Sequence, residues 1–426
     1  MRIRKLIDIK NLKNKRVLVR VDFNVPVKEG KVKDVYKIKK SLPTIQYLIK
    51  KGAQVILVSH LGRPKGVDKS LSLAPVAKEL EKMLGQTVAL GELCHCEAEG
   101  RSNPSAPQKP PGLLRCSLRL APRNDNGVVL LENIRFFPEE EKNDKKFAKQ
   151  LAGLAEIFVL DGFAVAHRDA ASVSGVAKFL PAYAGLLLTQ EIEGLSKVTD
   201  KPKKPLVAII GGVKMETKIP VIKQLLKKAN YILVGGGIMN TYLWAKGYDV
   251  GASLVDKEFK KAALAFGKNK KIILPVDVVV GKSNGSEARV VNCHSEPPKG
   301  VKNPLTNEKG SFASLRMTSG EAIFDIGPKT VQLFAKYIKK ANTLVWNGAL
   351  GMFEQSPYQH GTYAVARLFA ARSKGKAFGV TGGGETVQIL QKLGIIDEVD
   401  LVSTGGGAML EYLSGDKLPG VKAVTK

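Results

Sequence analysis

The stretch LVAIIGGVKMETKIPVIKQLLKKANYILVGGG, residues 206–237, holds two apolar runs, each ending in glycines, with a longer segment between them. LVAII and YILV are apolar at successive positions, so each would be a strand buried on both faces between layers of helices. The intervening IPVIKQLLKKA repeats its apolar residues at helical spacing. This alternation predicts a parallel sheet covered by helices.

The same alternation extends over the whole chain. Further helical segments are SLPTIQYLIKK, LAPVAKELEKML and KTVQLFAKYIKKA, and further strand-like runs are VLVRVDF, QVILVS, VVLLEN, IFVLDGF, IILPVDVVV, LVWNG and AFGVTGGG. Both halves are therefore predicted to be doubly wound α/β domains. PAYAGLLLTQEIEGLSKV has the spacing of a helix joining them. We expect an N-terminal domain over 1–183, an interdomain helix over 184–200, a C-terminal domain over 201–405, and a segment 406–426 that returns to the first domain.

The composition limits the class of protein. A chain of 426 residues with 44% hydrophobic residues is long enough for two ordinary domains. It shows no membrane-spanning run and no secretory signal, and four cysteines suit a reducing compartment, so we expect a cytoplasmic protein. The net charge of +28 raises the possibility of nucleic-acid binding. Because the lysines are spread along the chain, we favour a solvated lysine-rich surface.

Two segments, 93–126 and 292–319, break the alternation and resemble each other. CHCEAEGRSNP in the first returns as CHSEPPKGVKNP in the second, which indicates one short element inserted twice. All the cysteines lie here: Cys94, Cys96, Cys116 and Cys293. A zinc site needs four converging ligands, whereas neighbouring side chains in an extended chain alternate in direction. We expect mobile, metal-free insertions whose cysteines tolerate replacement by serine, with zinc binding as the alternative.

Glycine-rich turns follow the strands of the second half: GGVKMETK, GGGIMN, NGALG, GGGET and STGGGA. None has the spacing of a P-loop or of a dinucleotide-binding GxGxxG turn. Bare backbone N–H groups at helix N-termini bind anions, so several such turns in one domain predict a bound polyphosphate. Lys214 and Lys218 stand four residues apart at the start of a helix, where both ammonium groups would support that site. Considered alone, the pair could also be solvated lysines on an exposed turn.

The first half carries basic residues just after its strands, in RVDFNVP, SHLGRP, ENIRF and AHRD. Arginines from separate strands would form a pocket for a small polyanion. Asp22 would be repelled by that anion unless it accepted a hydrogen bond from a hydroxyl group. The pocket therefore suits a hydroxylated phospho-acid.

The order and length of these motifs resemble the phosphoglycerate kinase family. RVDFNVP, SLPTI, SHLGRP, LLENIRF, AHR, GGVKMETK, LPVDVVV, DIGPKT, LVWNGALGMFE, GGGET and STGGGAMLEYL follow one another in that family's order. The resemblance implies two Rossmann-like domains joined by a helical hinge, the first holding 3-phosphoglycerate or 1,3-bisphosphoglycerate and the second holding ATP or ADP with Mg²⁺. It also implies a monomeric glycolytic enzyme that uses small-molecule substrates and binds neither membrane nor nucleic acid.

Carried over by motif, the resemblance implies roles for individual residues. The glycerate ligand would contact Asp22, Phe23, Asn24, Lys37, His60, Leu61, Gly62, Arg63, Arg135 and Arg168. The nucleotide would contact Lys214, Lys218, Gly235, Gly236, Gly237, Gly327, Asn347, Glu354, Gly383, Gly384, Glu385 and Thr386, with Glu385 at the metal. Catalysis would rest on Lys37, Lys214, Gly383 and Gly384.

Four positions depart from the family's motifs. Lys37 stands where an arginine precedes SLPTI, Ala170 replaces the second histidine of AHRxHAS, Glu385 replaces the aspartate of GGGDT, and Ala349 replaces the proline of NGPMG. These departures bear on activity rather than on fold. They leave open an alternative function, namely a phosphoglycerate-kinase-like protein that binds nucleotide or nucleic acid without turnover.

Overall fold

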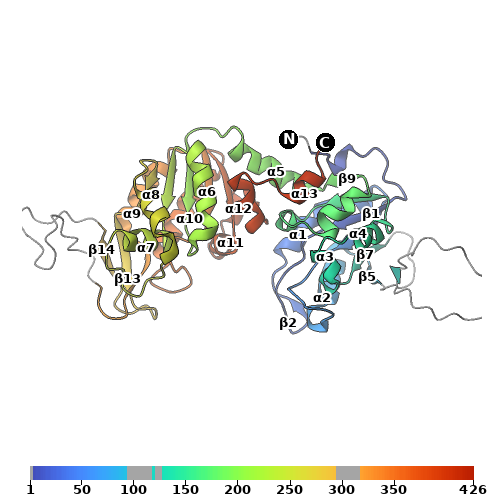
Figure 1. Cartoon of the computed structure of the whole chain (residues 1–426), viewed down its shortest axis with the longest axis horizontal. Helices are drawn as coiled ribbons and strands as arrows, with labels where there is room; N and C mark the ends of the chain where they lie inside the picture. Colours follow the sequence, from blue (N-terminus) through green and yellow to red (C-terminus); the bar gives the residue numbers. More distant parts are fainter. Residues whose placement is uncertain (1–2, 94–117, 120–126, 294–316) are drawn as a thin grey trace, which may run out of the picture. The chain divides into compact units, whose positions relative to one another are not determined.

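The computed structural model describes residues 3–93, 118–119, 127–293 and 317–426. The chain divides into two compact units, Met1–Ile192 with Lys417–Lys426 and Glu193–Asp416 (Figure 1). The division falls inside helix α5 (Leu186–Thr199), and the expected domain limits at 183 and 201 lie on either side of this helix. The C-terminal segment of the first unit begins at Lys417, whereas the sequence suggested 406.

The first unit is built on a seven-stranded sheet with the order β6-β5-β7-β4-β1-β8-β9. All neighbouring pairs are parallel except β5 with β6. The strands are β1 (Arg16–Arg20), β4 (Gln54–Val58), β5 (Val88–Leu93), β6 (Leu118–Arg119), β7 (Val128–Leu131), β8 (Ile157–Leu160) and β9 (Ala182–Ala184). The central strands are almost completely buried, as their uninterrupted apolar sequences predict. A separate hairpin joins β2 (Val27–Lys28) to β3 (Lys31–Val32).

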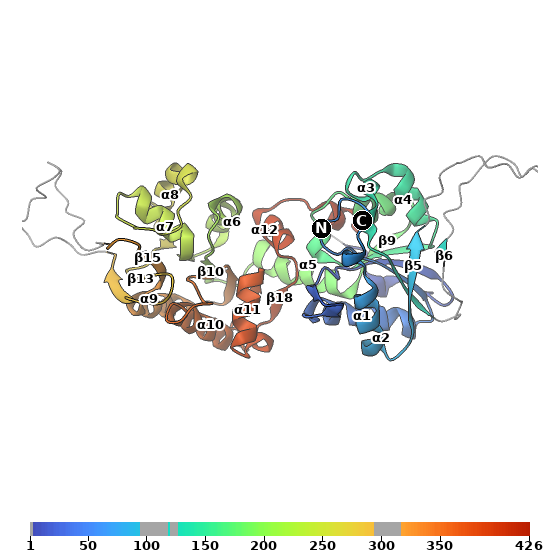
Figure 2. The same cartoon turned by 90° about the horizontal axis from the view of Figure 1, so that it is seen from below.

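Helices cover both faces of this sheet. Figure 2 shows α1 and α2 on one side of the strands and α3 and α4 on the other. Their amphipathic faces supply the core, with Ile38, Ile45 and Leu48 of α1 fully buried. The helices are α1 (Tyr36–Lys50), α2 (Ala74–Leu84), α3 (Pro138–Glu141), α4 (Lys145–Ala152) and α13 (Pro419–Ala423). Shorter helical turns are η1 (Leu6–Asp8), η2 (Lys69–Leu71), η3 (Ile134–Phe136), η4 (Phe163–Val165), η5 (Ala171–Gly175) and η6 (Val176–Lys178).

The second unit has a six-stranded, fully parallel sheet with the order β12-β11-β10-β16-β17-β18. Its strands are β10 (Leu206–Ile210), β11 (Tyr231–Val234), β12 (Ile272–Ile273), β16 (Thr343–Asn347), β17 (Phe378–Gly382) and β18 (Leu401–Ser403). Figure 2 shows α6, α7 and α8 on one side of the strands and α9, α10 and α11 on the other. Two such doubly wound sheets confirm the predicted α/β class.

The helices of the second unit are α6 (Met215–Lys228), α7 (Gly236–Ala245), α8 (Lys260–Gly267), α9 (Pro328–Ile338), α10 (His360–Ser373), α11 (Gly384–Lys392) and α12 (Gly407–Ser414), with the short turns η7 (Lys257–Phe259) and η8 (Ile396–Glu398). Of these, α6 and α9 correspond to the predicted segments IPVIKQLLKKA and KTVQLFAKYIKKA. In the part of the chain that the structure describes, no helix is both long and apolar enough to cross a bilayer.

One expected strand is wrong. The run IILPVDVVV divides into β12, at the edge of the parallel sheet, and β13 (Asp277–Gly281). The latter pairs antiparallel with β14 (Arg289–Asn292) and β15 (Ala322–Ile326) in a separate three-stranded sheet. Pro275 lies between the two pieces and has no N–H to donate, so it interrupts the ladder that a continuous strand would require.

The second insertion begins later than expected. Most of both insertions, residues 94–117, 120–126 and 294–316, lies outside the described residues, together with Cys94, Cys96 and Cys116. Cys293 is described and belongs to the fold, because it is 1% exposed and its N–H donates to the Val276 carbonyl at 2.8 Å. Burial raises the pKa of its thiol to about 12, so the thiol is neutral at physiological pH. The expectation that Cys293 lies in a dispensable surface loop is therefore corrected.

Replacement of Cys293 by serine is expected to lower the free energy of unfolding by about 1–3 kcal/mol, because a hydroxyl group would be buried in place of the thiol. Chemical denaturation would measure the change. Cys293→Ala is the matched control, since it removes the thiol without burying a polar atom, and it should be less harmful. A serine variant as stable as the parent would contradict the assignment of Cys293 to the core.

Candidate active site

The predicted residues of the first unit lie at the carboxyl ends of neighbouring strands. Asp22, Phe23 and Asn24 follow β1, and the stretch from His60 to Arg63 follows β4. Arg135 lies in η3 after β7, and Arg168 follows η4 beyond β8. Since the sheet order is β7-β4-β1-β8, these four loops are adjacent at one edge. Open parallel sheets place their ligand sites at this edge.

Lys37 is held in this site by Asp22. Its ammonium nitrogen lies 2.7 Å from Asp22 Oδ2 and 3.4 Å from the Asn24 carbonyl oxygen. Asp22 is 6% exposed, so a buried carboxylate finds its positive partner in a half-buried lysine. Asn24 Oδ1 in turn accepts from the N–H of Gly62 at 3.0 Å, which ties the loop after β1 to the loop after β4.

His60 is neutral, and its contact with Arg20 indicates which ring nitrogen carries the proton. Burial is the main cause that lowers its pKa well below the usual value, and the positive charges of Arg20, Arg135, Arg168 and Lys37 add to the effect. An Arg20 guanidinium nitrogen lies 3.3 Å from His60 Nδ1. Since arginine can only donate, Nδ1 accepts and the ring proton is on Nε2. His60 therefore offers an N–H donor without adding a positive charge.

The arginines crowd one another at this edge. Burial lowers the pKa of Arg135, and the neighbouring charges of Arg168 and Arg20 lower it further. Arg135 is positioned by the Gly62 carbonyl at 2.7 Å and by the carboxylate of Glu141 at 3.3 Å. Mutual repulsion among cations is relieved when an anion binds between them, so the cluster is suited to a small polyanion.

Arg63 and Arg168 are less enclosed than the other predicted residues. The Arg63 side chain is exposed and that of Arg168 is half-buried. Leu61 and Phe23 are buried, and their backbone N–H groups donate to Asn133 Oδ1 at 3.2 Å and to Ser59 Oγ at 2.8 Å. Motif reading missed these two supporting side chains, although Ser59 begins SHLGRP and Asn133 lies within LLENIRF.

Ala170, a departure from the expected motif, is the N-cap residue of η5. It is buried, and its carbonyl accepts from the N–H groups of Val173, Ser174 and Gly175 at the start of η5. Its role in the structure is that of a backbone acceptor.

In the second unit, Lys218 and Asn347 form the centre of a polar cluster. Lys218 is 8% exposed and donates to Asn347 Oδ1, while Asn347 Nδ2 donates to the Gly382 carbonyl at 2.6 Å. Burial lowers the pKa of Lys218 to about 8, and the carboxylate of Glu385 partly opposes this shift. A buried ammonium with so little compensating charge is prepared to receive an anion.

The glycine turn before α11 completes this cluster. Gly383 has φ of +99°, a conformation that residues with a side chain avoid, and it caps the helix that begins at Gly384. A Cβ atom at Gly383 would come within 3.0 Å of Asn347 Nδ2. Thr386 Oγ1 accepts from the Gly348 N–H at 2.9 Å, so the turn after β16 and the start of α11 are joined.

Lys214 stands apart from Lys218 in its surroundings. It is the N-cap residue of α6 and its side chain is exposed, whereas Lys218 is buried one turn later. The two lysines of the predicted pair therefore differ in solvation.

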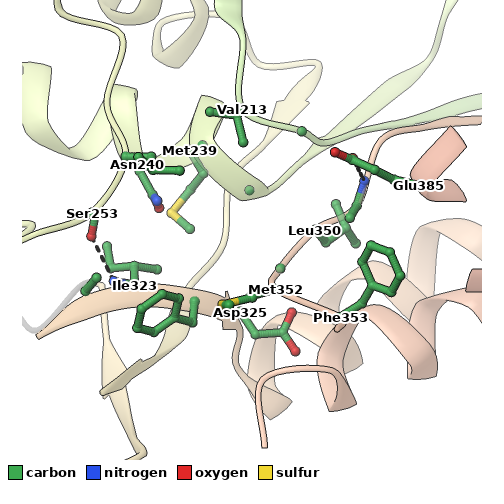
Figure 3. Close-up of a pocket in the computed structure, with 18 of the residues that line it drawn as sticks. Val213, Met239, Asn240, Ser253, Ile323, Asp325, Leu350, Met352, Phe353 and Glu385 are labelled. Atoms are coloured by element: carbon green, nitrogen blue, oxygen red, sulfur yellow. Dashed lines mark hydrogen bonds between the residues drawn. The ribbon is translucent and has the colours of Figure 1, made fainter. Parts of the chain in front are cut away.

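Beside the polar cluster lies a cavity of about 300 Å³ with largely apolar walls (Figure 3). Gly212, Gly236 and Gly237 form part of its rim, where bare backbone allows close approach. Side chains from α7, from β15 and from the loop after β16 complete it, among them Met239, Ile323, Leu350, Met352 and Phe353. A slot of this size with apolar walls suits a planar organic group.

Of the predicted nucleotide-binding residues, Gly236, Gly237, Glu354 and Glu385 line the cavity. Gly235 lies behind its wall, where an added Cβ would meet Leu350 at 2.7 Å. Gly327, also predicted to contact the nucleotide, caps α9 outside the cavity lining, where an added Cβ would meet the Asp277 carboxylate at 2.3 Å. Ala322, Ile323, Phe324 and Asp325, on the preceding strand, line the cavity instead.

Asn240 is a wall residue that motif reading missed. Its side chain is 5% exposed, and its Oδ1 atom is buried without a hydrogen-bond partner among the described residues. Ser253 and Asp325, also on the wall, are satisfied by the N–H groups of Ile323 and Gly361. A buried acceptor left open in an apolar slot is costly unless a ligand satisfies it. In the sequence, the position of Asn240 three residues after Gly237 gave no indication that it lines a cavity.

The arrangement fits a divalent cation that arrives with phosphates. Within the described ranges, no three His, Cys, Asp or Glu side chains gather to form a complete metal site. Mg²⁺ ordinarily uses one or two protein carboxylates and takes further oxygens from phosphates and water. Glu385, close enough to Lys218 to influence its pKa, is a carboxylate that could take this role.

Comparison with known proteins extends over both units. A family model described as phosphoglycerate kinase matches residues 6–416. The phosphoglycerate kinases of Pelotomaculum thermopropionicum and Moorella thermoacetica are each 44% identical to this chain, over 422 and 423 residues, with 97% of both chains covered. The solved structure of phosphoglycerate kinase from Coxiella burnetii is similar with a TM-score of 0.80 and 39% identity, covering 99% of each chain.

Proposed function

Because this chain belongs to the phosphoglycerate kinase family, we propose that its first unit binds the glycerate substrate and its second unit binds the nucleotide. The chain is a glycolytic phosphotransferase that moves a phosphoryl group reversibly between 1,3-bisphosphoglycerate and ADP, giving 3-phosphoglycerate and ATP. The observation that carries the assignment of sites is the crowded cationic edge of the first unit, where neighbouring positive charges lower the pKa values of His60 and Arg135 and would be balanced by a bound anion. The alternative of binding without turnover is not favoured by these relatives.

The glycerate ligand would be held by charge and by hydrogen bonds of defined direction. Arg135, Arg168 and Arg63 would bind its phosphate and carboxylate oxygens, since guanidinium groups match oxyanions bidentately. His60 would donate through Nε2 without increasing the repulsion among the arginines. Asp22, with Asn24 beside it, would accept from the ligand hydroxyl, because the Asp22 charge is already balanced by Lys37.

The nucleotide would enter the second unit with its base in the apolar cavity, between the Gly236 and Gly237 backbone and the Leu350 side chain. The open acceptor of Asn240 suits a base that carries a hydrogen-bond donor. Glu354 is exposed at the cavity wall, where its carboxylate would bind the ribose hydroxyls. The phosphates would bind beside Lys218, Asn347 and Thr386 and meet the N-terminus of α11 at Gly383 and Gly384.

We propose Mg²⁺ as the accompanying metal and Glu385 as its protein carboxylate. When bound, the metal neutralises phosphate charge and orients the transferring group. The reaction needs no covalent intermediate, so the chain contributes positioning and positive charge. Lys37 in the first unit and Lys214 in the second would stabilise the transferring phosphoryl group, and the N–H groups at the start of α11 would add to that charge.

We further propose that the protein acts as a monomer in the cytoplasm, with small molecules as its partners. Its basic charge is distributed in lysines along both units, and the cationic site of the first unit gathers arginines at the ends of neighbouring strands, which favours a compact anion over a nucleic-acid backbone.

The reaction itself is tested in a coupled assay with ATP, 3-phosphoglycerate and Mg²⁺. We expect ATP consumption that requires both substrates and stops when a chelator removes the metal. Circular dichroism establishes that the sample is folded. Folded protein without substrate-dependent ATP consumption would overturn the assignment, and activity that survives the chelator would overturn the proposed role of the metal alone.

A further inference from the structure

The carboxylate of Glu385 is held by a backbone donor from another part of the second unit. The N–H of Ala349 donates to Glu385 Oε2 at 3.2 Å, a bond drawn as a dashed line in Figure 3. Ala349 lies in the turn after β16, and Glu385 is the second residue of α11. These are two of the four positions at which the chain departs from the motifs it otherwise follows, and they meet in a single hydrogen bond.

The donor, the N–H of Ala349, is held in place by the backbone around it. The carbonyl of Ala349 accepts from the N–H of Gly212 at 2.8 Å, and the carbonyl of Leu350 accepts from Gly236 at 3.0 Å. Ala349 is 6% exposed, and an added Cβ at Gly211 would come within 2.1 Å of its carbonyl oxygen. The turn is therefore confined by the backbone around it, and its N–H points to a set position.

The acceptor, the Glu385 carboxylate, is carried by a side chain with several rotatable bonds. A glutamate side chain has one more rotatable bond than an aspartate, and unrestrained it would sample more positions for its carboxylate. A hydrogen bond to one oxygen limits that sampling and leaves the other oxygen available. Partners of metal-binding carboxylates commonly act in this way. A proline at position 349 has no N–H and could not provide the bond.

We propose that the Ala349 N–H is a positioning group for the Glu385 carboxylate at the metal–nucleotide site, so that Ala349 and Glu385 act as one functional pair. The inference rests on the proposed function, in which Glu385 is the carboxylate for the divalent cation. The inference goes beyond that function by assigning a role to Ala349. It also explains how glutamate, which is longer than aspartate, serves at position 385.

A double-mutant cycle tests the pair with Mn²⁺ as the probe. The parent, Ala349→Pro, Glu385→Asp and the double variant are titrated with Mn²⁺ at saturating ADP, and binding is followed by electron paramagnetic resonance without turnover. We expect Ala349→Pro to weaken Mn²⁺ binding on the order of tenfold in the parent and to have no such effect when Glu385 is aspartate. Effects that simply multiply in the double variant would overturn the inference.

Two further measurements, of ADP binding without metal and of hydrogen exchange at the Ala349 amide, distinguish loss of the hydrogen bond from damage to the turn. Binding of ADP without metal should be the same in the parent and in Ala349→Pro, and its loss would show that the proline damages the turn. In that event hydrogen exchange decides, since Glu385→Ala should make the Ala349 amide exchange faster while position 349 is unchanged. Unaltered exchange would overturn the pair. Failure of the parent to bind Mn²⁺ with ADP would overturn the metal role of Glu385, and this inference with it.

Discussion

Lys37→Ala is expected to lower kcat on the order of a hundredfold or more while leaving the affinity for nucleotide unchanged. Two effects act together at this position. The transition state loses a cation that would neutralise the transferring phosphoryl group. In addition, the buried carboxylate of Asp22 loses the ammonium group 2.7 Å away and then repels the anionic substrate. Steady-state kinetics in the coupled assay, with a separate titration of ADP, would measure both quantities.

Two variants on the same helix complete this test. Lys37→Arg keeps the charge and adds a planar fork that grips two oxygens, so it should preserve or raise the rate. Lys39→Ala removes an equally charged but exposed side chain two residues further along α1 and should leave kcat unchanged. If Lys37→Ala were nearly as active as the parent and Lys39→Ala were not, the catalytic lysine would be Lys39.

Lys218→Met is expected to weaken ADP binding by about 10- to 100-fold, because a hydrogen bond to a charged group contributes about 1.5–3 kcal/mol. The lowered pKa of Lys218, about 8, adds a pH dependence. Only the protonated amine attracts the phosphates, so in the parent the affinity should be constant below pH 8. It should fall towards tenfold for each pH unit above that value. Calorimetric titration of ADP between pH 7 and pH 9.5 would show the slope.

The slope is specific to Lys218. It should be absent in Lys218→Met and present in Lys223→Met, which removes an exposed lysine from the same helix. Lys214→Ala provides a contrast, since it should reduce kcat more than nucleotide affinity because its exposed ammonium matters most during transfer. An ADP affinity that is flat across this pH range in the parent would contradict the buried, cationic role of Lys218.

The sequence by itself determined the class of fold and the inventory of chemical groups. Uninterrupted apolar runs such as LVAII signal burial on both faces, and glycines directly after them mark the strand ends where ligands bind. The arginines and histidines of RVDFNVP, SHLGRP, ENIRF and AHRD could be placed at one edge of a sheet for the same reason. Such signals are local, because periodicity and turn chemistry act over neighbouring residues.

Only the tertiary structure decided which groups meet and in what state. The periodicity of the sequence does not indicate that β13 leaves the parallel sheet, that Cys293 is buried, or that Gly327 lies against the Asp277 carboxylate. The neutral state of His60 and the low pKa of Lys218 arise from burial and from charges brought close by folding. The bond between Ala349 and Glu385 joins residues 36 positions apart. Desolvation and short-range contacts depend on three-dimensional distance, which spacing along a chain does not contain.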